Sequence, residues 1–204
     1  MTYALEGSIF STGSVIQWLV DGLKILERSV LTTEFSSKLG TNEELYFVPA
    51  LAGLGAPYWD SRARGMIIGI TGGTTRADII RAALESICYQ SRDVLQAFEI
   101  STGRKIDTVR VDGGGSTNDF LMQFFADITG KEVQRAQITE TTALGTAQLA
   151  GLAFGFWNNL REIEDSWRLD RRFVPKMKVE TRDRLYQKWQ DGVSRSRSWA
   201  QDKS

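Results

Sequence analysis

The sequence predicts an α/β fold, in which short strands alternate with longer helices along one continuous chain. Short runs of β-branched and aromatic residues, bounded by Gly or Pro, are typical of buried strands. Between them, apolar residues recur every three or four positions, as they do on one face of a helix. The 204 residues include only three prolines, and neither a repeat nor a low-complexity linker interrupts the alternation.

The first part of the chain predicts one helix and two strands. A helix is expected over about 8–27, because apolar residues within 16–26 recur at helical spacing. Buried strands are expected over 45–50 and 66–70, and the glycine-rich sequence GLGAPYWD between them predicts a loop.

The longest helix is expected over about 76–98. Thr75 is a suitable N-cap for it, and Asp78 adds a negative charge to its first turn. The single cysteine, Cys88, falls in the apolar stripe of this helix. We therefore expect Cys88 to be a packed, reduced thiol in the core rather than a reactive one.

The second half of the chain continues the alternation. Gly130 is expected to end the helix that precedes it. A further helix is rich in Ala and Gly, which would let another backbone approach it closely. The expected elements are, in order, a strand over 109–111, a helix beginning near Phe120, a strand over 132–136, the Ala- and Gly-rich helix over 142–154, and a terminal amphipathic helix over about 180–200.

Composition excludes several classes of function. Lys and Arg together number 25, as do Asp and Glu, so the net charge of zero offers no general attraction to nucleic acid or to an anionic membrane. The chain contains no histidine, which removes serine-triad catalysis and most zinc chemistry. The N-terminus lacks the features of a signal peptide, and no window is long and apolar enough to span a membrane. We therefore expect a cytoplasmic protein.

The sequence VDGGGSTNDF, residues 111–120, is a candidate binding turn between a strand and a helix. It matches neither the P-loop, since no Lys follows the glycines, nor the dinucleotide fingerprint, since Asn118 replaces the last glycine. Consecutive glycines and the first N–H groups of a helix still favour a flat or anionic ligand there. An ordinary tight turn with Asn118 or Thr117 as N-cap explains the same residues.

A second candidate lies in the first predicted helix, in the sequence STGSVIQ, residues 11–17. Gly13 and Gln17 are four residues apart and therefore lie one above the other on the helix. A glycine beneath a long amide suits a base or a ribose pressed against the helix. A helix-packing glycine with a solvated glutamine is the simpler alternative.

These motifs resemble the FGGY family of carbohydrate kinases. The sequence GMIIGITGGTTRADIIRAALE, residues 65–85, fits that family's second signature at every constrained position. Further stretches resemble the glycerol kinases within the family: YALEG at 3–7, GLGAPYWD at 53–60, ARG at 63–65, RVDGG at 110–114 and TALG at 142–145. The resemblance covers nearly the whole chain and is weakest at its two ends.

The resemblance implies an actin-like ATPase (ribonuclease H-like) fold, of which residues 1–204 would be the C-terminal, nucleotide-binding half. It implies that Gly13, Gln17, Gly114 and Asn118 contact ATP or ADP. It also implies an ATP-dependent glycerol kinase that uses Mg²⁺ with the nucleotide. A third glycine, Gly115, and the acid that follows Asn118 depart from the usual pattern.

The resemblance also implies what the chain lacks. In the family, the N-terminal domain holds the phosphate-binding loop, the glycerol contacts and the aspartate proposed to take the hydroxyl proton. Phosphoryl transfer needs positioning and charge neutralisation on both sides of the transferred group. We therefore expect no catalytic residue and no metal ligand here, an N-terminal kinase domain as partner, and no turnover by the chain alone. A homo-oligomer remains open.

Other residues give weaker indications. Arg62 and Arg64 in the aromatic loop are candidates to pair with phosphate, but a loop tied down by a contact between Asp60 and an Arg is the better interpretation. Asp112 and Glu140 are candidates only for supporting positions beside the predicted turns. Two alternative functions remain open: a kinase of another polyol or ketose, and a non-catalytic actin-like module that binds nucleotide or assembles.

Overall fold

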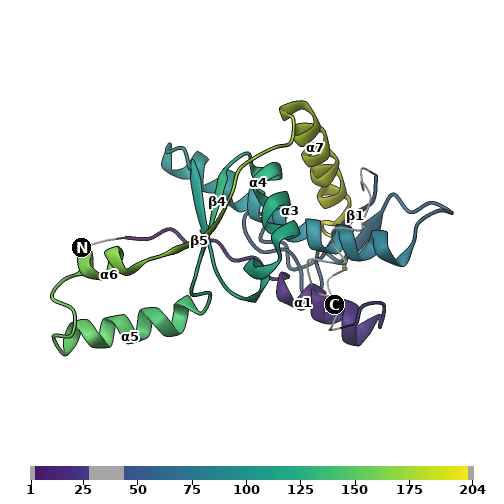
Figure 1. The fold of residues 1–204 in the computed structure, drawn as a ribbon. Coiled ribbons are helices and arrows are strands. Elements are labelled where there is room, and N and C mark those ends of the chain that lie inside the picture. Colours follow the sequence, from purple (N-terminus) through teal and green to yellow (C-terminus); the bar gives the residue numbers. More distant parts are fainter. Residues whose placement is uncertain (1–2, 28–43, 202–204) are drawn as a thin grey trace.

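The computed structural model describes residues 3–27 and 44–201 and confirms the α/β class (Figure 1). Within these residues the strands form two sheets. The first is antiparallel and pairs β1 (Tyr46–Val48) with β2 (Met66–Ile68). In the second, β3 (Thr108–Val111) lies parallel to β4 (Glu132–Ala136), which pairs antiparallel with β5 (Leu169–Phe173).

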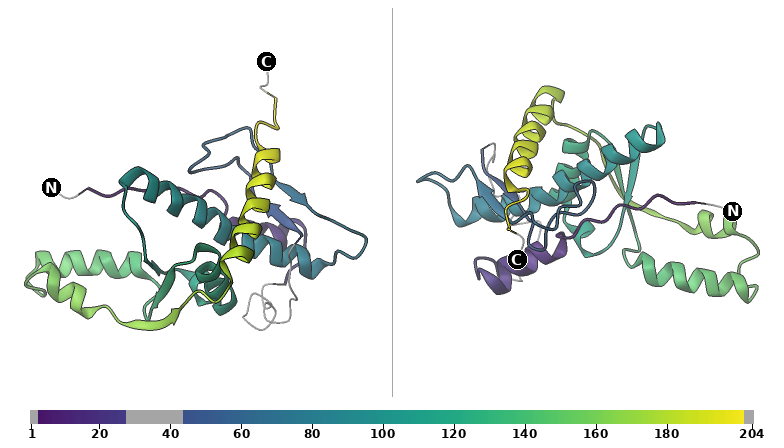
Figure 2. Two further views of the ribbon diagram at one scale, coloured as in Figure 1. Left: turned by 90° about the horizontal axis from the view of Figure 1, so that it is seen from above. Right: turned by 180° about the vertical axis from the view of Figure 1, so that it is seen from behind.

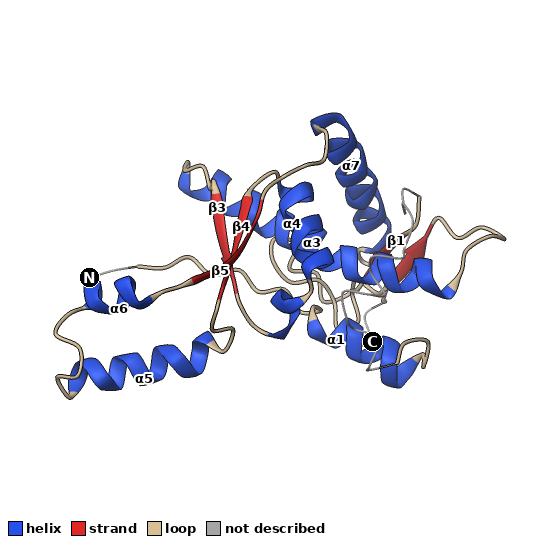
Figure 3. Cartoon of the chain, viewed as in Figure 1, coloured by secondary structure: helices blue, strands red, loops and turns tan. Residues whose placement is uncertain are grey.

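Helices surround the two sheets (Figure 3). The longest, α3, has 27 residues and lies between them in the fold, contacting β1 and α4. The helical elements in chain order are α1 (Gly13–Gln17), the π-helix η1 (Trp18–Gly22), α3 (Arg76–Thr102), the 3₁₀-helix η3 (Gly114–Thr117), α4 (Asp119–Thr129), α5 (Thr141–Ala153), α6 (Leu160–Ser166) and α7 (Val179–Ser196).

The ends of α3 and α4 follow from the residues predicted to set them. The Asp78 carboxylate accepts hydrogen bonds from both the N–H and the hydroxyl of Thr75, at 2.8 and 2.7 Å, which stabilises the first turn of α3. Gly130 follows α4 with a φ of 68°, a left-handed conformation that glycine adopts without strain. Both predictions are confirmed.

The main core lies where α7 packs on α3 and β1. Trp189 is fully buried, and its ring stacks on Tyr89 with 5.2 Å between the ring centroids. The indole Nε1 of Trp189 donates a hydrogen bond to the buried Asp93 carboxylate at 2.9 Å, and the Tyr186 hydroxyl donates to the same carboxylate. These four residues, which we call the α3–α7 core, hold the terminal helix in place.

The first helix begins later than the sequence predicts. It was expected from about residue 8, but α1 begins at Gly13 and continues as the π-helix η1 only to Gly22. The preceding backbone is used for tertiary contacts: the Ser8 carbonyl accepts from the Ala56 N–H at 2.8 Å, and the Ser11 carbonyl accepts from the Gln90 amide at 3.1 Å. These two carbonyls accept tertiary hydrogen bonds in place of the backbone hydrogen bonds of a helix.

Two elements were missed by the sequence prediction, and several ends were placed one to four residues away. The strand β5 has only its last residue, Phe173, buried, so it shows no apolar alternation. The short helix α6 begins at the Asn159 cap, whose Oδ1 accepts from the Glu162 N–H at 3.1 Å. The terminal helix ends at Ser196 rather than near residue 200.

The segment containing α5 and α6 projects away from the rest of the molecule as a helical hairpin (Figure 2). It comprises residues 141–166, and we call it the α5–α6 hairpin. Neither helix contains a buried residue. Phe154 and Leu149, for example, are 92% and 65% exposed.

Candidate functional site

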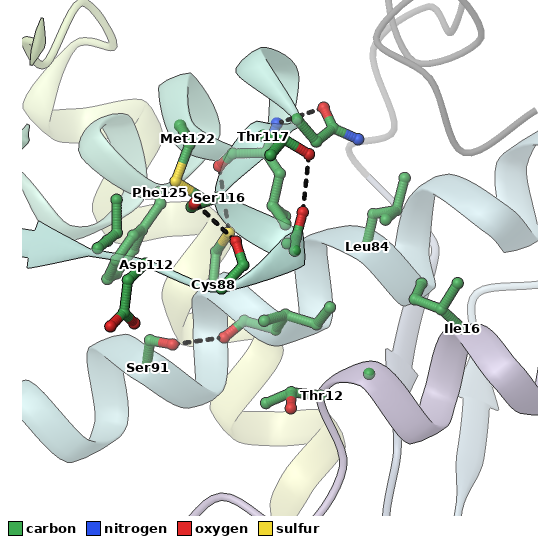
Figure 4. Close-up of a pocket in the computed structure, with 18 of the residues that line it drawn as sticks. Thr12, Ile16, Leu84, Cys88, Ser91, Asp112, Ser116, Thr117, Met122 and Phe125 are labelled. Atoms are coloured by element: carbon green, nitrogen blue, oxygen red, sulfur yellow. Dashed lines mark hydrogen bonds between the residues drawn. The ribbon is translucent and has the colours of Figure 1, made fainter. Parts of the chain in front are cut away.

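A cavity of about 790 Å³ lies between α1, α3 and the turn that leads from β3 into α4 (Figure 4). All four residues predicted to contact a nucleotide line it: Gly13 and Gln17 from α1, and Gly114 and Asn118 from the turn. The two motifs are about a hundred residues apart in sequence. The fold therefore brings together two segments that the sequence identified separately.

The turn from β3 to α4 has a defined backbone. Gly113 has a φ of 75°, which disfavours any residue with a side chain, and its N–H donates to the Thr139 carbonyl at 2.9 Å. This bond ties the end of β3 to the segment that follows the parallel strand β4. The carboxyl ends of parallel strands are where ligands bind in open α/β sheets.

Asn118 caps the helix that closes the site. Its Oδ1 accepts from the Leu121 N–H at 3.1 Å, and its side chain is almost fully buried. The alternative interpretation of Asn118 as an N-cap is thus confirmed. The cap bond uses the amide oxygen, and the Nδ2 group is the donor of this side chain.

The glycines keep the cavity open. A Cβ atom placed on Gly13, Gly114 or Gly115 would meet no other atom within 4 Å, so packing inside this chain does not require glycine at these positions. All three line the cavity, and each lacks the side chain that would project from its backbone there. A flat group can consequently lie directly against the backbone.

One wall of the cavity is apolar. It consists of apolar side chains from α1, η1, α3 and α4 that face the cavity. The lining apolar residues are Ile16, Val20, Leu84, Ile87, Leu121, Met122 and Phe125. An apolar wall opposite a polar, glycine-rich turn is the composition typical of small-molecule sites.

Cys88 is part of the cavity lining and is buried, as predicted. Its Sγ donates to the Leu121 carbonyl at 3.5 Å. Burial raises the pKa of the Cys88 thiol well above its ordinary value, so it stays protonated at neutral pH. The geometry supports packing rather than thiolate chemistry.

Gln17 is exposed at the rim of the cavity. Its Nε2 donates to the Asp21 carboxylate one turn further along the helix. Gly13 and Gln17 share the cavity-facing side of α1, as their spacing predicts. Because Gln17 is held by a solvent-exposed contact within one helix, it can exchange Asp21 for a ligand at little cost.

The sequence left unexplained how a negative charge at Asp119 is accommodated beside the site. Arg135 on β4 donates to the Asp119 carboxylate at 2.9 Å and to the Ser116 carbonyl at 2.8 Å, and Arg171 on β5 pairs with the same carboxylate. Asp119 is therefore neutralised. Arg135 was not among the predicted residues, because only the parallel pairing of β3 and β4 places it next to this turn.

The loop after β1 is not part of the site. The Asp60 carboxylate accepts the N–H groups of Arg62, Ala63 and Ser198 at 2.8 to 3.0 Å, and these bonds lower the pKa of Asp60. The Arg197 guanidinium lies 3.8 Å from the same carboxylate. The loop is tied down by an Asp–Arg contact, as expected, although the partner comes from beyond α7.

The other weak candidates divide between the site and its surroundings. Asp112 lines the cavity, and Glu140 precedes the first residue of α5. Arg64 donates to the carbonyls of Ser61 and Ala63 and does not line the cavity. The residues described contain no group of three or more potential metal ligands, and none of their helices is long and apolar enough to cross a membrane.

Comparison with known proteins identifies the class to which this fold and site belong. The model of the C-terminal domain of the FGGY family of carbohydrate kinases matches residues 1–154, and the chain belongs to this family. The chain has the actin-like ATPase fold of these sugar kinases, which confirms the predicted fold.

Individual relatives are more specific. The chain is 58% identical to glycerol kinase 2 of Thermotoga maritima over 197 residues, and 57% identical to the glycerol kinase of Pseudothermotoga lettingae over 201 residues. These matches cover 97% and 98% of this chain but only 40% of each relative. The chain thus spans about two fifths of the length of the curated relatives it matches.

Solved structures give the same result. The alignment with the structure of Plasmodium falciparum glycerol kinase with ADP spans 92% of this chain and 37% of the other, with a TM-score of 0.82 and 33% identity. A xylulose kinase from Lactobacillus acidophilus aligns over 91% of this chain and 38% of its own, with a TM-score of 0.75. At 23% identity the second likeness shows the fold alone.

Proposed function

We propose that residues 1–204 form the C-terminal, nucleotide-binding half of an ATP-dependent glycerol kinase, which transfers a phosphoryl group from MgATP to glycerol to give glycerol 3-phosphate. One observation carries the proposal: Gly13, Gln17, Gly114 and Asn118, identified from two separate motifs, line one cavity. The relatives named glycerol kinase, at 52–58% identity, support the choice of acceptor. Such a kinase would work in the cytoplasm, where ATP is available.

The composition of the cavity fits the adenosine end of a nucleotide. The apolar wall suits the faces of a base, and the glycine-lined turn lets a ribose or a base lie against the backbone. The Nδ2 of Asn118 and the amide of Gln17 are the polar groups that would orient it. Asp119 presents no net repulsion to a polyanion, since Arg135 and Arg171 pair with it.

The phosphate chemistry would take place outside the described residues. The Mg²⁺ that accompanies ATP would take its protein contacts from the part of such a kinase that this chain does not match. When bound, Mg²⁺ supplies charge neutralisation to the transferred phosphoryl group. We therefore assign this chain the binding and orientation of the nucleoside, and expect it to show no turnover alone.

Calorimetric titration with ADP tests the assignment of the cavity. We expect binding by the wild-type chain and an affinity at least about tenfold weaker for Asn118→Asp, which keeps the helix cap but removes the Nδ2 donor. Asn158→Asp, on the α5–α6 hairpin and outside the cavity, is the matched control and should bind as the wild type does. Equal affinity of all three proteins would contradict the role of Asn118.

The kinase activity itself would require the part of the relatives that this chain does not match. We propose to co-express this chain with the portion of Thermotoga maritima glycerol kinase 2 that it does not match, and to measure ADP release with glycerol, xylulose and gluconate as acceptors. Activity with glycerol, and none from either part alone, is the expected result. A preference for another acceptor would retain the nucleotide site and overturn glycerol as substrate.

A further inference from the structure

The turn between β3 and α4, residues 112–118, which we call the glycine turn, has little side-chain packing to hold its conformation. A Cβ atom placed on Gly113, Gly114 or Gly115 would meet no other atom within 4 Å. Glycine also leaves the backbone more conformational freedom than any other residue. The turn nevertheless carries Gly114 and Asn118 to the cavity. Contacts from neighbouring elements are therefore needed to keep it in one conformation.

The backbone of the glycine turn is bonded partly within itself and partly to β4. The Ser116 N–H donates to the Gly113 carbonyl at 3.1 Å. The Asn118 N–H donates to the Gly115 carbonyl at 3.3 Å. The Ser116 carbonyl, in contrast, accepts from the Arg135 guanidinium at 2.8 Å. Ser116 is buried and lines the cavity (Figure 4), so Arg135 reaches the main chain of the site itself.

The guanidinium of Arg135 is held in a fixed orientation. Its Nε donates to the Asp170 carboxylate at 2.7 Å, and its Nη1 donates to the Asp119 carboxylate at 2.9 Å. The Phe173 ring centroid lies 5.6 Å from its Cζ, and only 12% of the side chain is exposed. These contacts use the rigid, planar fork that distinguishes Arg from Lys. A lysine at this position would keep the charge and lose the fork.

The strand pairing at Arg135 is unfavourable for the sheet alone. Arg135 on β4 lies directly opposite Arg171 on β5, and like charges in opposite positions destabilise a sheet. Both guanidinium groups pair with Asp119, the first residue of α4. The two strands thus bring their cations to the point where the glycine turn enters the helix. Arg135 does this without lining the cavity itself.

We propose that Arg135 is a positioning residue of the nucleotide site. By holding the Ser116 carbonyl it fixes the glycine turn, and the turn sets where the Gly114 backbone and the Asn118 amide meet the ligand. A site held in its binding conformation beforehand loses less conformational freedom when the ligand binds. The inference rests on the proposed function, because it takes a nucleotide as the ligand of the turn. If Arg135 only neutralised Asp119, any cation at its position would serve.

Calorimetric titration with ADP and with adenosine separates the two roles. Arg135→Lys keeps the charge, and we expect its affinity for both ligands to fall by the same factor, at least about fivefold. Adenosine carries no charge, so a purely electrostatic role of Arg135 would affect ADP alone.

Two further variants serve as controls in the same titrations. Asp119→Asn keeps an acceptor for Arg135 and removes the charge, and it should bind both ligands within about twofold of the wild type. Arg172→Lys makes the matched change on β5, at a side chain that is 54% exposed and outside the cavity, and it should bind as the wild type does.

Hydrogen exchange in the chain without ligand tests the glycine turn directly. The N–H groups of Ser116 and Asn118 donate within the turn, so their exchange reports its opening. In Arg135→Lys we expect both amides to exchange at least about tenfold faster than in the wild type, while Gly130 at the other end of α4 keeps its rate. Equal acceleration at Gly130 would assign Arg135 a general structural role and overturn the proposal.

Asp170→Asn is a second variant, which keeps the test decisive if circular dichroism shows that Arg135→Lys does not fold. Asp170 is 43% exposed and does not line the cavity, and its loss loosens the guanidinium of Arg135 from the far side. We expect about threefold weaker binding of both ligands, and no further loss when the change is added to Arg135→Lys. Wild-type affinity and exchange in Asp170→Asn, with Arg135→Lys unfolded, would overturn the proposal.

The outcomes separate this inference from the proposed function. Wild-type affinity of Arg135→Lys for both ligands, or a loss confined to ADP, would overturn the positioning role and retain the nucleotide site. A wild-type chain that binds neither ADP nor adenosine would overturn the proposed function and the nucleotide as ligand. The exchange rates at Ser116 and Asn118 would then decide by themselves whether Arg135 holds the turn.

Discussion

Helices α3 and α7 and the α5–α6 hairpin all contain many apolar residues, and they differ in whether the rest of the chain covers those residues. Helix α3 has eleven buried residues, including Tyr89 and Asp93, whereas α5 has none. The apolar stripes of α3 and α7 face each other within this chain. The hairpin that contains α5 projects from the rest of the molecule (Figure 2), and Leu149 of α5 is 65% exposed. The hydrophobicity of a helix therefore does not by itself predict that the helix is buried within its own chain.

The largest effect is expected from a change in the α3–α7 core. Trp189→Ala removes a fully buried ring that stacks on Tyr89, and leaves the Asp93 carboxylate without its 2.9 Å indole donor. Truncating a buried aromatic residue costs about 3–5 kcal/mol. We expect a loss of this size in the free energy of unfolding, measured by urea titration. A loss below about 1 kcal/mol would show that α7 contributes little to the stability of the core.

The same core makes stability dependent on pH. Burial raises the pKa of Asp93 from 3.8 to about 6, and hydrogen bonds from Tyr186 and Trp189 offset this only in part. The folded state therefore holds the proton more tightly than the unfolded state does. This stabilisation is complete below about pH 4 and is lost as the pH rises through 6; a two-unit shift corresponds to about 3 kcal/mol.

We expect the difference in unfolding free energy between wild type and Asp93→Asn to shift by about 2 kcal/mol between pH 4 and pH 7.5, with the wild type relatively weaker at the higher pH. Burial also raises the pKa of Glu85, to about 7, against the opposing effect of Arg81, so Glu85→Gln is the control that removes the other group titrating in this range. A difference between wild type and Asp93→Asn that does not vary with pH would contradict the raised pKa of Asp93.

A smaller effect is expected at the cavity, which lies outside the α3–α7 core. Asn118→Ala removes the acceptor for the Leu121 N–H at the start of α4 and should cost about 1 kcal/mol. Asn118→Asp retains an acceptor at that position and should unfold within about 0.5 kcal/mol of the wild type. If both variants lose the same stability, the side chain of Asn118 does more than cap the helix.

Sequence patterns predicted the elements of the fold where local chemistry determines them. Thr75 and Asp78 fix the start of α3, and Gly130 ends α4, through contacts within a few residues. The strand β5 was missed because β4 imposes its extended conformation from a distance. The late start of α1 has a similar cause, since Gln90 and Ala56 hold the preceding carbonyls.

The candidate site was predicted in its parts but not in its arrangement. The glycine turn and the Gly13–Gln17 pair were each identified, and their convergence on one cavity required the packing of α1 and α4 on α3. Arg135 was missed because its role depends on the register of β3 and β4, which places Arg135 opposite Val111. No local sequence pattern predicts that register.

The smallest effect is expected in the α5–α6 hairpin. Leu149→Ala shortens an outward side chain of α5 that is 65% exposed, so it should change the unfolding free energy of the isolated chain by no more than about 0.5 kcal/mol. Leu185→Ala, the same substitution at a buried position of α7, should cost about 2–5 kcal/mol. Because the chemistry of the two changes is identical, their difference measures burial within this chain alone. A cost at Leu149 as large as that at Leu185 would contradict the exposed position of α5 in the chain.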